Sequence, residues 1–331
     1  MIDLRSDTVT RPDEAMKAAM LAAETGDDVY GEDPTVNRLE AISAEITGKQ
    51  AGLFVSSGTQ GNLLALLTHC QRGEEYIAGQ EAHTYRFEAG GGAVLGSIQP
   101  QPVPFNSRGE LDLDQVRRVI KPNDFHFAVT RLVCLEDTQG GKPLALPYLA
   151  DYVALTTEFN LSRHLDGARL FNAAVAQGVP PGRICEHFDS VSFCLSKGLG
   201  CPVGSVLVGP EDFIQRARRW RKMLGGGMRQ AGILGAAGIH ALENNIGRLA
   251  EDHINAARLG AGLVELGIAL AEDVHTNMVM LDPRATDIGK LRAFLATRDI
   301  TISGPRLVTH LDVTAEDVDR VLEACSAFSR G

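Results

Sequence analysis

Hydrophobic residues in the first two thirds of the chain alternate between helical and extended patterns. After Asp33-Pro34 they recur every three or four positions until Gly48, which predicts a helix with Asp33 as N-cap and a proline in its first turn. Short apolar runs that predict buried strands stand at 53–55, 76–78, 132–135, around 165, 190–195 and 205–208, and helical patterns at 60–69 and 147–159. Strands that alternate with helices predict an α/β fold with a mostly parallel central sheet.

The pattern changes near residue 230. A long helical stretch at 243–266 is followed by shorter segments. These are predicted strands near 277–281, 300–302 and 306–308 and a helix at 288–296. A last helix begins near Thr314, with Asp317 at its N3 position. We therefore predict a large domain over residues 1–240, which includes an N-terminal arm, and a smaller C-terminal α+β domain over residues 241–331.

Composition restricts the function classes. The 331 residues carry a net charge of −10, which disfavours a nucleic-acid binder or a protein bound to anionic membranes. No apolar stretch reaches the roughly 20 residues that span a bilayer, and the polar N-terminus does not resemble a signal peptide. The six cysteines form no CxxC pair, so we expect neither a disulfide framework nor a metal site. These features predict a cytoplasmic protein without membrane or nucleic-acid partners.

The first candidate for chemistry is Ser57-Gly58-Thr59, between a predicted strand and a predicted helix. Unpaired N–H groups and the helix dipole make a helix N-terminus suitable for a phosphate, and a glycine allows close approach of the backbone. An ordinary helix cap fits the same residues. Neither nucleotide-binding fingerprint, GxxxxGK[ST] or GxGxxG, is present.

Two further candidates follow predicted strands. Asp166 stands at a strand end, where ligands bind in open α/β sheets, and it could pair with a protonated heterocyclic nitrogen. Arg169 could reach a carboxylate, although an Asp–Arg ion pair at a turn fits these two residues equally well. Lys197 lies between an apolar strand and a glycine-rich turn. A lysine is seldom buried without a partner, and a desolvated lysine amine is a nucleophile for Schiff-base chemistry. The alternative is a strand-end lysine that reaches solvent.

A phosphate cup, an acidic strand end and then a lysine follow one another in the order of fold-type I pyridoxal-phosphate (PLP) enzymes. The sequence resembles the low-specificity L-threonine aldolases, the threonine aldolase group of the aspartate-aminotransferase-like PLP superfamily, along nearly its whole length. The matching blocks are IDLRSDTVTRP, GDDVYGEDPTVNRLE, AHTYRFEAGG, HLDGARLFNA, CLSKGLGCPVGS, RKMLGGGMRQAG and RLVTHLDV. The resemblance implies a fold-type I PLP-dependent transferase-like architecture. It also implies a lyase that cleaves L-threonine, L-allo-threonine and other β-hydroxy-α-amino acids to glycine and an aldehyde.

The resemblance also implies roles for single residues. Lys197 would hold the cofactor as a Schiff base, Asp166 would keep its pyridine nitrogen protonated, and His83 would stack on its face. The remaining cofactor contacts would be Ser57, Gly58, Thr59, Arg169 and Arg229. The substrate contacts would be Ser6, Tyr30, Arg169 and Arg306. His83, His126 or a water molecule would act as the base that takes the β-hydroxyl proton.

In this superfamily the site usually lies at a dimer interface. We therefore expect a homodimer or homotetramer in which Tyr30 or Arg229 comes from the neighbouring subunit. One block departs from the family pattern: the chain has Asp137-Thr138-Gln139 where such enzymes usually carry Asn-Thr-His. Three rival interpretations remain, namely another PLP reaction such as β-elimination or racemisation, a non-catalytic PLP-binding protein, and a nucleotide-binding module, which the missing fingerprints disfavour.

Overall fold

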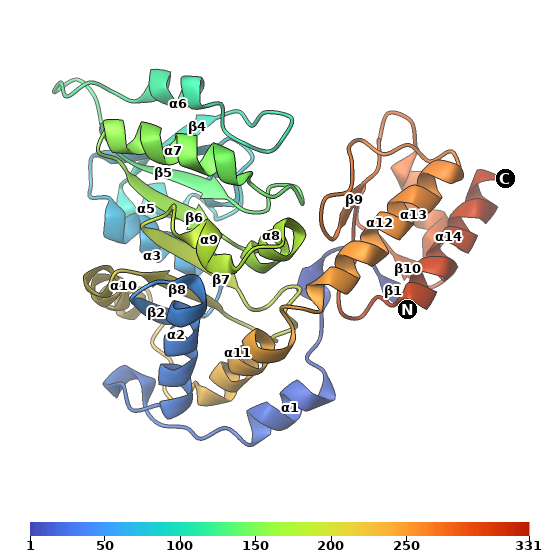
Figure 1. Ribbon diagram of the computed structural model, residues 1–331, viewed down its shortest axis with the longest axis horizontal. Coiled ribbons are helices and arrows are strands. Elements are labelled where there is room, and N and C mark those ends of the chain that lie inside the picture. Colours follow the sequence, from blue (N-terminus) through green and yellow to red (C-terminus); the bar gives the residue numbers. More distant parts are fainter. Residues whose placement is uncertain (331) are drawn as a thin grey trace.

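A seven-stranded sheet forms the centre of the large domain in the computed structural model, which describes residues 1–330 (Figure 1). The order across the sheet is β2 (Ala51–Val55), β8 (Ser205–Gly209), β7 (Ser190–Cys194), β6 (Ser162–Asp166), β5 (Val129–Glu136), β3 (Glu74–Gly79) and β4 (Gln99–Val103). Only β8 runs antiparallel to its neighbours, so the mostly parallel sheet predicted from the sequence is confirmed.

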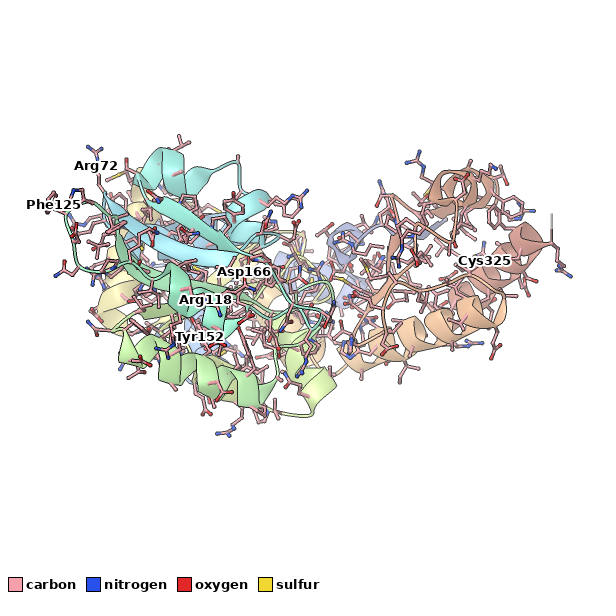
Figure 2. The ribbon with its side chains drawn as sticks, turned by 90° about the horizontal axis from the view of Figure 1, so that it is seen from above. Arg72, Arg118, Phe125, Tyr152, Asp166 and Cys325 are labelled. Carbon is pink, nitrogen blue, oxygen red and sulfur yellow. The ribbon has the colours of Figure 1, made fainter. Side chains whose placement is uncertain are left out.

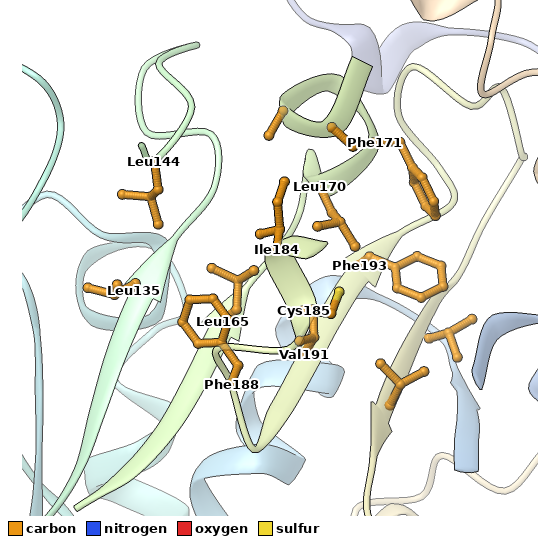
Figure 3. Packing of buried hydrophobic residues seen from close by; sticks show 14 of the residues in the cluster. Leu135, Leu144, Leu165, Leu170, Phe171, Ile184, Cys185, Phe188, Val191 and Phe193 are labelled. Atoms are coloured by element: carbon orange, nitrogen blue, oxygen red, sulfur yellow. The ribbon is translucent and has the colours of Figure 1, made fainter. Parts of the chain in front are cut away.

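Helices cover both faces of this sheet. One face packs against α3 (Gly58–His69) and α10 (Glu211–Met223), with α5 (Gly91–Gly96) beside α3. The other face carries α2 (Pro34–Thr47), α6 (Leu113–Val119), α7 (Leu146–Glu158), α8 (Leu170–Gln177) and α9 (Pro181–Cys185). Figure 3 shows how side chains of β5, β6 and β7 interdigitate there with those of α8 and α9, including Leu165, Ile184 and Phe193. Next to α2 lie α1 (Glu14–Leu21) and α11 (Gly232–Asn244).

The small domain has a separate hydrophobic core. Its elements are α12 (Leu249–Glu265), β9 (Met278–Met280), α13 (Ile288–Ala296), β10 (Ile300–Thr301), β11 (Arg306–Val308) and α14 (Ala315–Ser329). The first strand, β1 (Ile2–Asp3), pairs in parallel with β10, and Ile2 and Leu4 lie in the small domain's core. The N-terminal arm therefore belongs structurally to the C-terminal domain, whereas the sequence analysis grouped it with residues 1–240.

Several helix ends predicted from the sequence are confirmed. Asp33 caps α2, Pro34 opens it and Gly48 ends it in a left-handed conformation. Thr314 and Asp317 form a reciprocal capping box at α14. The single helix predicted at 243–266 is wrong, because α11 ends at Asn244 and α12 begins only at Leu249. Asn and Gly in this stretch are poor helix formers, and the Asn245 side chain donates instead to the carbonyl of Leu199, at 2.8 Å.

Among residues 1–330, no helix is both long enough and apolar enough to cross a bilayer.

Candidate functional site

The three candidate segments meet at one edge of the sheet. The strands β2, β6 and β7 run in the same direction, so their carboxyl ends lie together. Gly58 begins α3 directly after β2, and a Cβ atom added there would lie 2.9 Å from the Sγ atom of Cys194 at the end of β7. The absence of a side chain at Gly58 thus lets the α3 N-terminus approach the turn that carries Lys197.

Ser57 is the N-cap of α3. Its hydroxyl accepts a hydrogen bond from the N–H of Gln60, at 3.2 Å. The N–H groups of Gly58 and Thr59 have no acceptor among the described residues. Because a helix N-terminus concentrates positive partial charge, these two groups are available to an anion. The cap and the phosphate interpretations of this motif are therefore compatible.

Asp166 ends β6 and is 3% exposed. Its Oδ1 accepts from the N–H of Ala168, at 3.1 Å, and its Oδ2 accepts from the side-chain amide of Asn62, at 2.8 Å. The same Asn62 amide donates to Oε1 of Glu88, also at 2.8 Å. Asn62 therefore fixes two buried carboxyl groups with the two hydrogens of one nitrogen.

His83 begins α4 (His83–Arg86) and lies beside these carboxyl groups. Its Nδ1 is 2.8 Å from Oε1 of Glu88, and its backbone N–H donates to Glu136 at 2.7 Å. The hydrogen bond to Glu88 is the main cause that raises the pKa of His83, to which Asp166 adds. Burial, and then the charge of Asp166, raise the pKa of Glu136 to about 7. The site therefore combines one imidazole with two carboxyl groups that raise its pKa, Glu88 and Asp166, and a third, Glu136, that accepts from the backbone N–H of His83.

His83, Glu88 and Asp166 offer ligand atoms within 4.8 Å of one another, a spacing that could hold a cation. The Asn62 amide and the His83 ring already occupy both carboxyl groups with hydrogen bonds. A cation would have to displace those bonds.

Lys197 stands three residues after β7, and its side-chain amine has no hydrogen bond or ion pair within residues 1–330. Its positive charge lowers the pKa values of Asp7, His83 and Glu136, which places its amine near all three. The following turn is tight: a Cβ atom at Gly198 would lie 2.9 Å from Leu249, and Gly200 has a φ of +81°. A partly buried lysine amine without a carboxylate partner is suited to nucleophilic attack on a carbonyl carbon.

The two arginines expected at a substrate carboxylate differ in their surroundings. Arg169 is buried and donates from Nε and from one terminal nitrogen to Asp7, at 2.7 and 2.6 Å. Burial alone would raise the pKa of Asp7, but Arg169 overcomes this effect and lowers it to about 2. Arg306 on β11 is exposed and has no carboxylate partner in the described chain, and desolvation and the charge of Arg169 lower its pKa. Ser6 precedes Asp7 and caps the short helix η1 (Asp7–Val9).

Three predicted site residues have no hydrogen bond or ion pair with Asp166, Lys197 or His83 within the described chain. Tyr30 is 75% exposed, and the guanidinium of Arg229 lies over its ring at 5.8 Å. Arg229 also pairs with Asp27, at 2.9 Å. His126 is exposed and bonded to Asp124. Figure 2 shows its neighbour Phe125 at the end of the large domain remote from the small domain, whereas Asp166 lies toward the junction.

The sequence analysis missed Asn62, Glu88, Glu136 and Asp7. Asn62 follows Gly58 by one helical turn, so helical spacing could have placed it near the cup. Glu88 and Asp7 lie within two of the matching blocks, and Glu136 begins the block that departs from the family pattern. None of these carboxyl groups has a local signal that distinguishes it from a surface acid.

Comparisons with known proteins agree with this geometry. A family model described as "Beta-eliminating lyase" matches residues 3–286. A low specificity L-threonine aldolase of Escherichia coli K12 is 55% identical over 331 residues, which covers 99% of each chain. A probable low-specificity L-threonine aldolase 2 of Arabidopsis thaliana is 44% identical and covers 97% of this chain and 95% of its own.

Solved structures share the fold. A threonine aldolase of Leishmania major superposes with a TM-score of 0.85 at 22% identity, covering 99% of this chain and 100% of its own. A serine palmitoyltransferase of Sphingomonas wittichii gives a TM-score of 0.79 at 19% identity, covering 99% and 87%. The predicted fold-type I architecture is thereby confirmed.

Proposed function

Because this chain belongs to the beta-eliminating lyase family and, within it, to the low-specificity L-threonine aldolases, we propose that it is a PLP-dependent lyase that cleaves L-threonine and L-allo-threonine to glycine and acetaldehyde. Other β-hydroxy-α-amino acids fit the same chemistry and would release other aldehydes. The observation that carries the proposal is the meeting of Lys197, Asp166 and the N-terminus of α3 at one edge of the sheet.

The described residues fit PLP. Gly58 and Thr59 offer N–H groups without acceptors for the phosphate, buried Asp166 offers a carboxylate for the ring nitrogen, and Lys197 offers an amine for covalent attachment. When bound, the cofactor supplies an electron sink for the electron pair left on Cα when a bond to it breaks. Asp166 would hold a proton at the ring nitrogen through an opposite-charge pair.

Orientation of the substrate selects the bond that breaks. Arg306 has a guanidinium free of acidic partners and can bind both oxygens of a substrate carboxylate. Arg169 is committed to Asp7 through two of its nitrogens, so it supports the site mainly as a fixed positive charge. A carboxylate held at this side of the site would fix the orientation of the substrate, and with it which bond to Cα breaks.

His83 is the best-placed base for the β-hydroxyl proton. Donation from its Nδ1 to Glu88 leaves Nε2 as the unprotonated nitrogen of the neutral ring. Loss of the hydroxyl proton to Nε2 forms the aldehyde carbonyl as the Cα–Cβ bond breaks, and the pair left on Cα then takes up a proton to give glycine. His126 can contribute only if its loop comes from another subunit, because within one chain it lies far from Asp166.

We further propose a cytoplasmic homodimer or homotetramer in which Tyr30, Arg229 and His126 complete the site of a neighbouring subunit. In support, all three side chains are exposed and none has a hydrogen bond or ion pair with Asp166, Lys197 or His83. The phosphate would then gain the charge of Arg229 from the neighbour. Six buried cysteines without disulfides within the described chain fit a reducing compartment.

The test replaces Lys197 with alanine. Lys197→Ala should lose the visible absorbance of the covalently bound cofactor and lower acetaldehyde release from L-threonine by more than about 1,000-fold, because the attacking amine is gone. Lys290→Ala, which removes an exposed lysine of α13, is the matched control and should behave as wild type. Equal aldehyde release from Lys197→Ala and wild type would contradict the role of Lys197.

The family model's description favours β-elimination as the second candidate. Release of pyruvate and ammonia from a β-substituted amino acid, without aldehyde from threonine, would select it.

A further inference from the structure

A continuous series of hydrogen bonds leads away from Asp166 across the α3 side of the sheet. Oδ1 of Asn62 is 3.2 Å from Nε2 of His164, and Nδ1 of His164 is 2.8 Å from the hydroxyl of Ser190. That hydroxyl is also 2.8 Å from Nε2 of His69, at the last residue of α3. We refer to Asp166, Asn62, His164, Ser190 and His69 as the Asp166 relay.

The fold dictates which groups can meet. Asn62 and His69 stand two helical turns apart on α3, about 10 Å along its axis. His164 on β6 and Ser190 on β7 are directly paired neighbours in the parallel sheet beneath that helix. Helix and sheet together therefore place five polar side chains in line.

The direction of every bond follows from the chemistry of the side chains. Asn62 uses both amide hydrogens on Asp166 and Glu88, so its oxygen faces His164, and His164 must donate to it from Nε2. Nδ1 of a neutral His164 then accepts from the Ser190 hydroxyl, whose oxygen accepts from Nε2 of His69. All donors thus point toward Asp166.

Both rings are neutral at physiological pH. Burial lowers the pKa of His164 to about 3 and that of His69 to about 4. His164 and Ser190 are fully buried, which excludes water as a competing partner. Each ring can therefore be only one of two neutral tautomers, and the bonds select the Nε2-protonated one for both.

We propose that Asn62, His164, Ser190 and His69 are positioning residues that hold Asp166 as a carboxylate aimed at the cofactor's ring nitrogen. This inference rests on the proposed function. Neutral donors stabilise negative charge through their dipoles and add no positive charge that would compete with a protonated ring nitrogen. The relay also fixes the Asn62 side chain. One hydrogen of its amide then stays on Asp166 and the other stays on Glu88.

The neighbouring carboxyl group of Glu88 explains why the orientation of Asn62 must be fixed. Burial raises the pKa of Glu88, and the charge of Asp166 raises it further. Glu88 and Asp166 therefore compete for the same Asn62 amide. The bond from His164 to the Asn62 oxygen fixes the orientation of that amide and so keeps one of its N–H groups on Asp166.

Two variants test the relay with cofactor binding as the readout. Asn62→Asp is isosteric but replaces the shared donor with an acceptor, and it should raise the Kd for PLP at least about tenfold. Ser190→Ala leaves Nδ1 of His164 without its hydrogen-bond donor and breaks the link to His69, and it should raise the Kd about threefold or more. Thr68→Val is the matched control. It removes a buried hydroxyl next to His69 that bonds only the carbonyl of Leu64, and should change the Kd less than twofold.

Two readouts separate positioning from general destabilisation. In ¹⁵N NMR, His164 of the wild type should be protonated at Nε2, with or without cofactor. Ser190→Ala leaves the Asn62 oxygen in place, so it should keep this tautomer but shift the Nδ1 signal, because that nitrogen loses its hydrogen bond. The visible absorbance of the bound cofactor should become pH-dependent near neutrality in Asn62→Asp, while that of Thr68→Val stays as in the wild type. Thermal unfolding of the apo-proteins checks that all variants are folded.

The outcomes are distinguishable. An Nδ1-protonated or charged His164 in the wild type overturns the relay. Unchanged Kd values for PLP in both Asn62→Asp and Ser190→Ala also overturn the relay. If the wild type binds PLP and releases acetaldehyde in that case, the proposed function stands. A wild type that binds no PLP overturns both.

Discussion

Asp137 belongs to the block that the sequence analysis set apart from the family pattern, and it is completely buried. Its backbone N–H donates to the carbonyl of Asp166 and its carbonyl accepts from the N–H of Arg169, at 2.8 and 3.0 Å. Its Oδ1 accepts from the N–H of Leu144, whereas Oδ2 has no partner. Burial raises the pKa of Asp137 well above its ordinary value. Burial therefore favours the protonated form of Asp137, which resembles an amide in shape.

The replacement Asp137→Asn should stabilise the protein increasingly as the pH rises. In the unfolded chain an aspartate loses its proton near pH 4, whereas folded Asp137 keeps it, so wild-type stability falls with rising pH until the folded carboxyl titrates. The free energy of unfolding of the variant, relative to wild type, should grow from pH 5 to 8 by up to about 1.4 kcal/mol per pH unit.

Urea unfolding at several pH values measures this difference. Asp151→Asn, at an exposed position of α7, controls for the loss of a charge. A stability difference for Asp137→Asn that stays constant with pH would show that Asp137 is ionised in the folded state.

The N-cap residues of α2 and α14 differ in how many segments of the chain they join. Oδ1 of Asp33 accepts from the N–H groups of Thr35 and Val36 at the start of α2. Its Oδ2 accepts from the N–H groups of Gly26 and Gly232, so the same carboxylate joins α2 to a preceding loop and to α11. A Cβ atom at Gly232 would lie 2.6 Å from this carboxylate, which explains glycine there. The cap of α14, by contrast, bonds only within its own helix turn.

We therefore expect unequal losses from removing the two caps. Thr314→Ala should lower the free energy of unfolding by about 1 kcal/mol, the usual value for an N-cap. Asp33→Ala should lower it by about 3 kcal/mol, because four backbone N–H groups lose their acceptor in a fully buried place. Urea unfolding of both variants compares them, and equal losses would mean that water replaces Asp33 at Gly26 and Gly232.

At the scale of elements, the sequence predicted those with a strong local signal. Asp33-Pro34, Gly48 and the Thr314–Asp317 pair marked helix ends that the structure confirms. The edge strand β4 was not predicted, because its sequence QPQPV carries two prolines, which only an edge strand tolerates. The pairing of β1 with β10 joins two-residue strands almost 300 positions apart, and no pattern of hydrophobic residues encodes it.

Asp7 connects the two domains of the molecule. It is fully buried, bonds Arg169 of the large domain through both oxygens, and accepts from the side chain of Asn277 in the small domain at 3.4 Å. The N-terminal arm thus ties the strand-end loop after Asp166 to the small domain's core.

Asp7→Asn should lower the free energy of unfolding at pH 7 by about 3–5 kcal/mol, because it leaves the buried Arg169 charge without its counter-ion. The folded pKa of Asp7, about 2, lies below the unfolded value near 4, so its contribution is complete above pH 4 and declines as the pH falls toward 2. The difference in the free energy of unfolding between Asp7→Asn and wild type, measured by urea unfolding, should become smaller as the pH falls from 4 to 2.

Asp3→Asn, which removes a carboxylate paired with exposed Arg5, should lose far less and serves as the control. Equal losses in the free energy of unfolding for Asp7→Asn and Asp3→Asn would contradict the role of Asp7 as counter-ion of Arg169.

For the whole molecule, local sequence singled out the segment 57–59, Asp166 and Lys197 as candidates, and the structure brings all three to one edge of the sheet. It could not reveal that Arg169 is committed to Asp7 or that Asn62 serves two carboxyl groups, because these contacts join residues from distant parts of the chain. The same reason explains the site's four missed residues. Their functions depend on neighbours that only the fold supplies.

The pairing of β1 with β10 also orders events during synthesis. At about 5–20 residues per second, roughly 15–60 s separate the emergence of β1 from that of its partner strand. The large domain's sheet can form in this interval, whereas Ile2 and Leu4 have no core to enter until residues 300–308 leave the ribosome. Asp7 follows these residues directly, so its contact with Asn277 must also form late. The N-terminal arm can therefore take its final place only after residues 300–308 have been translated.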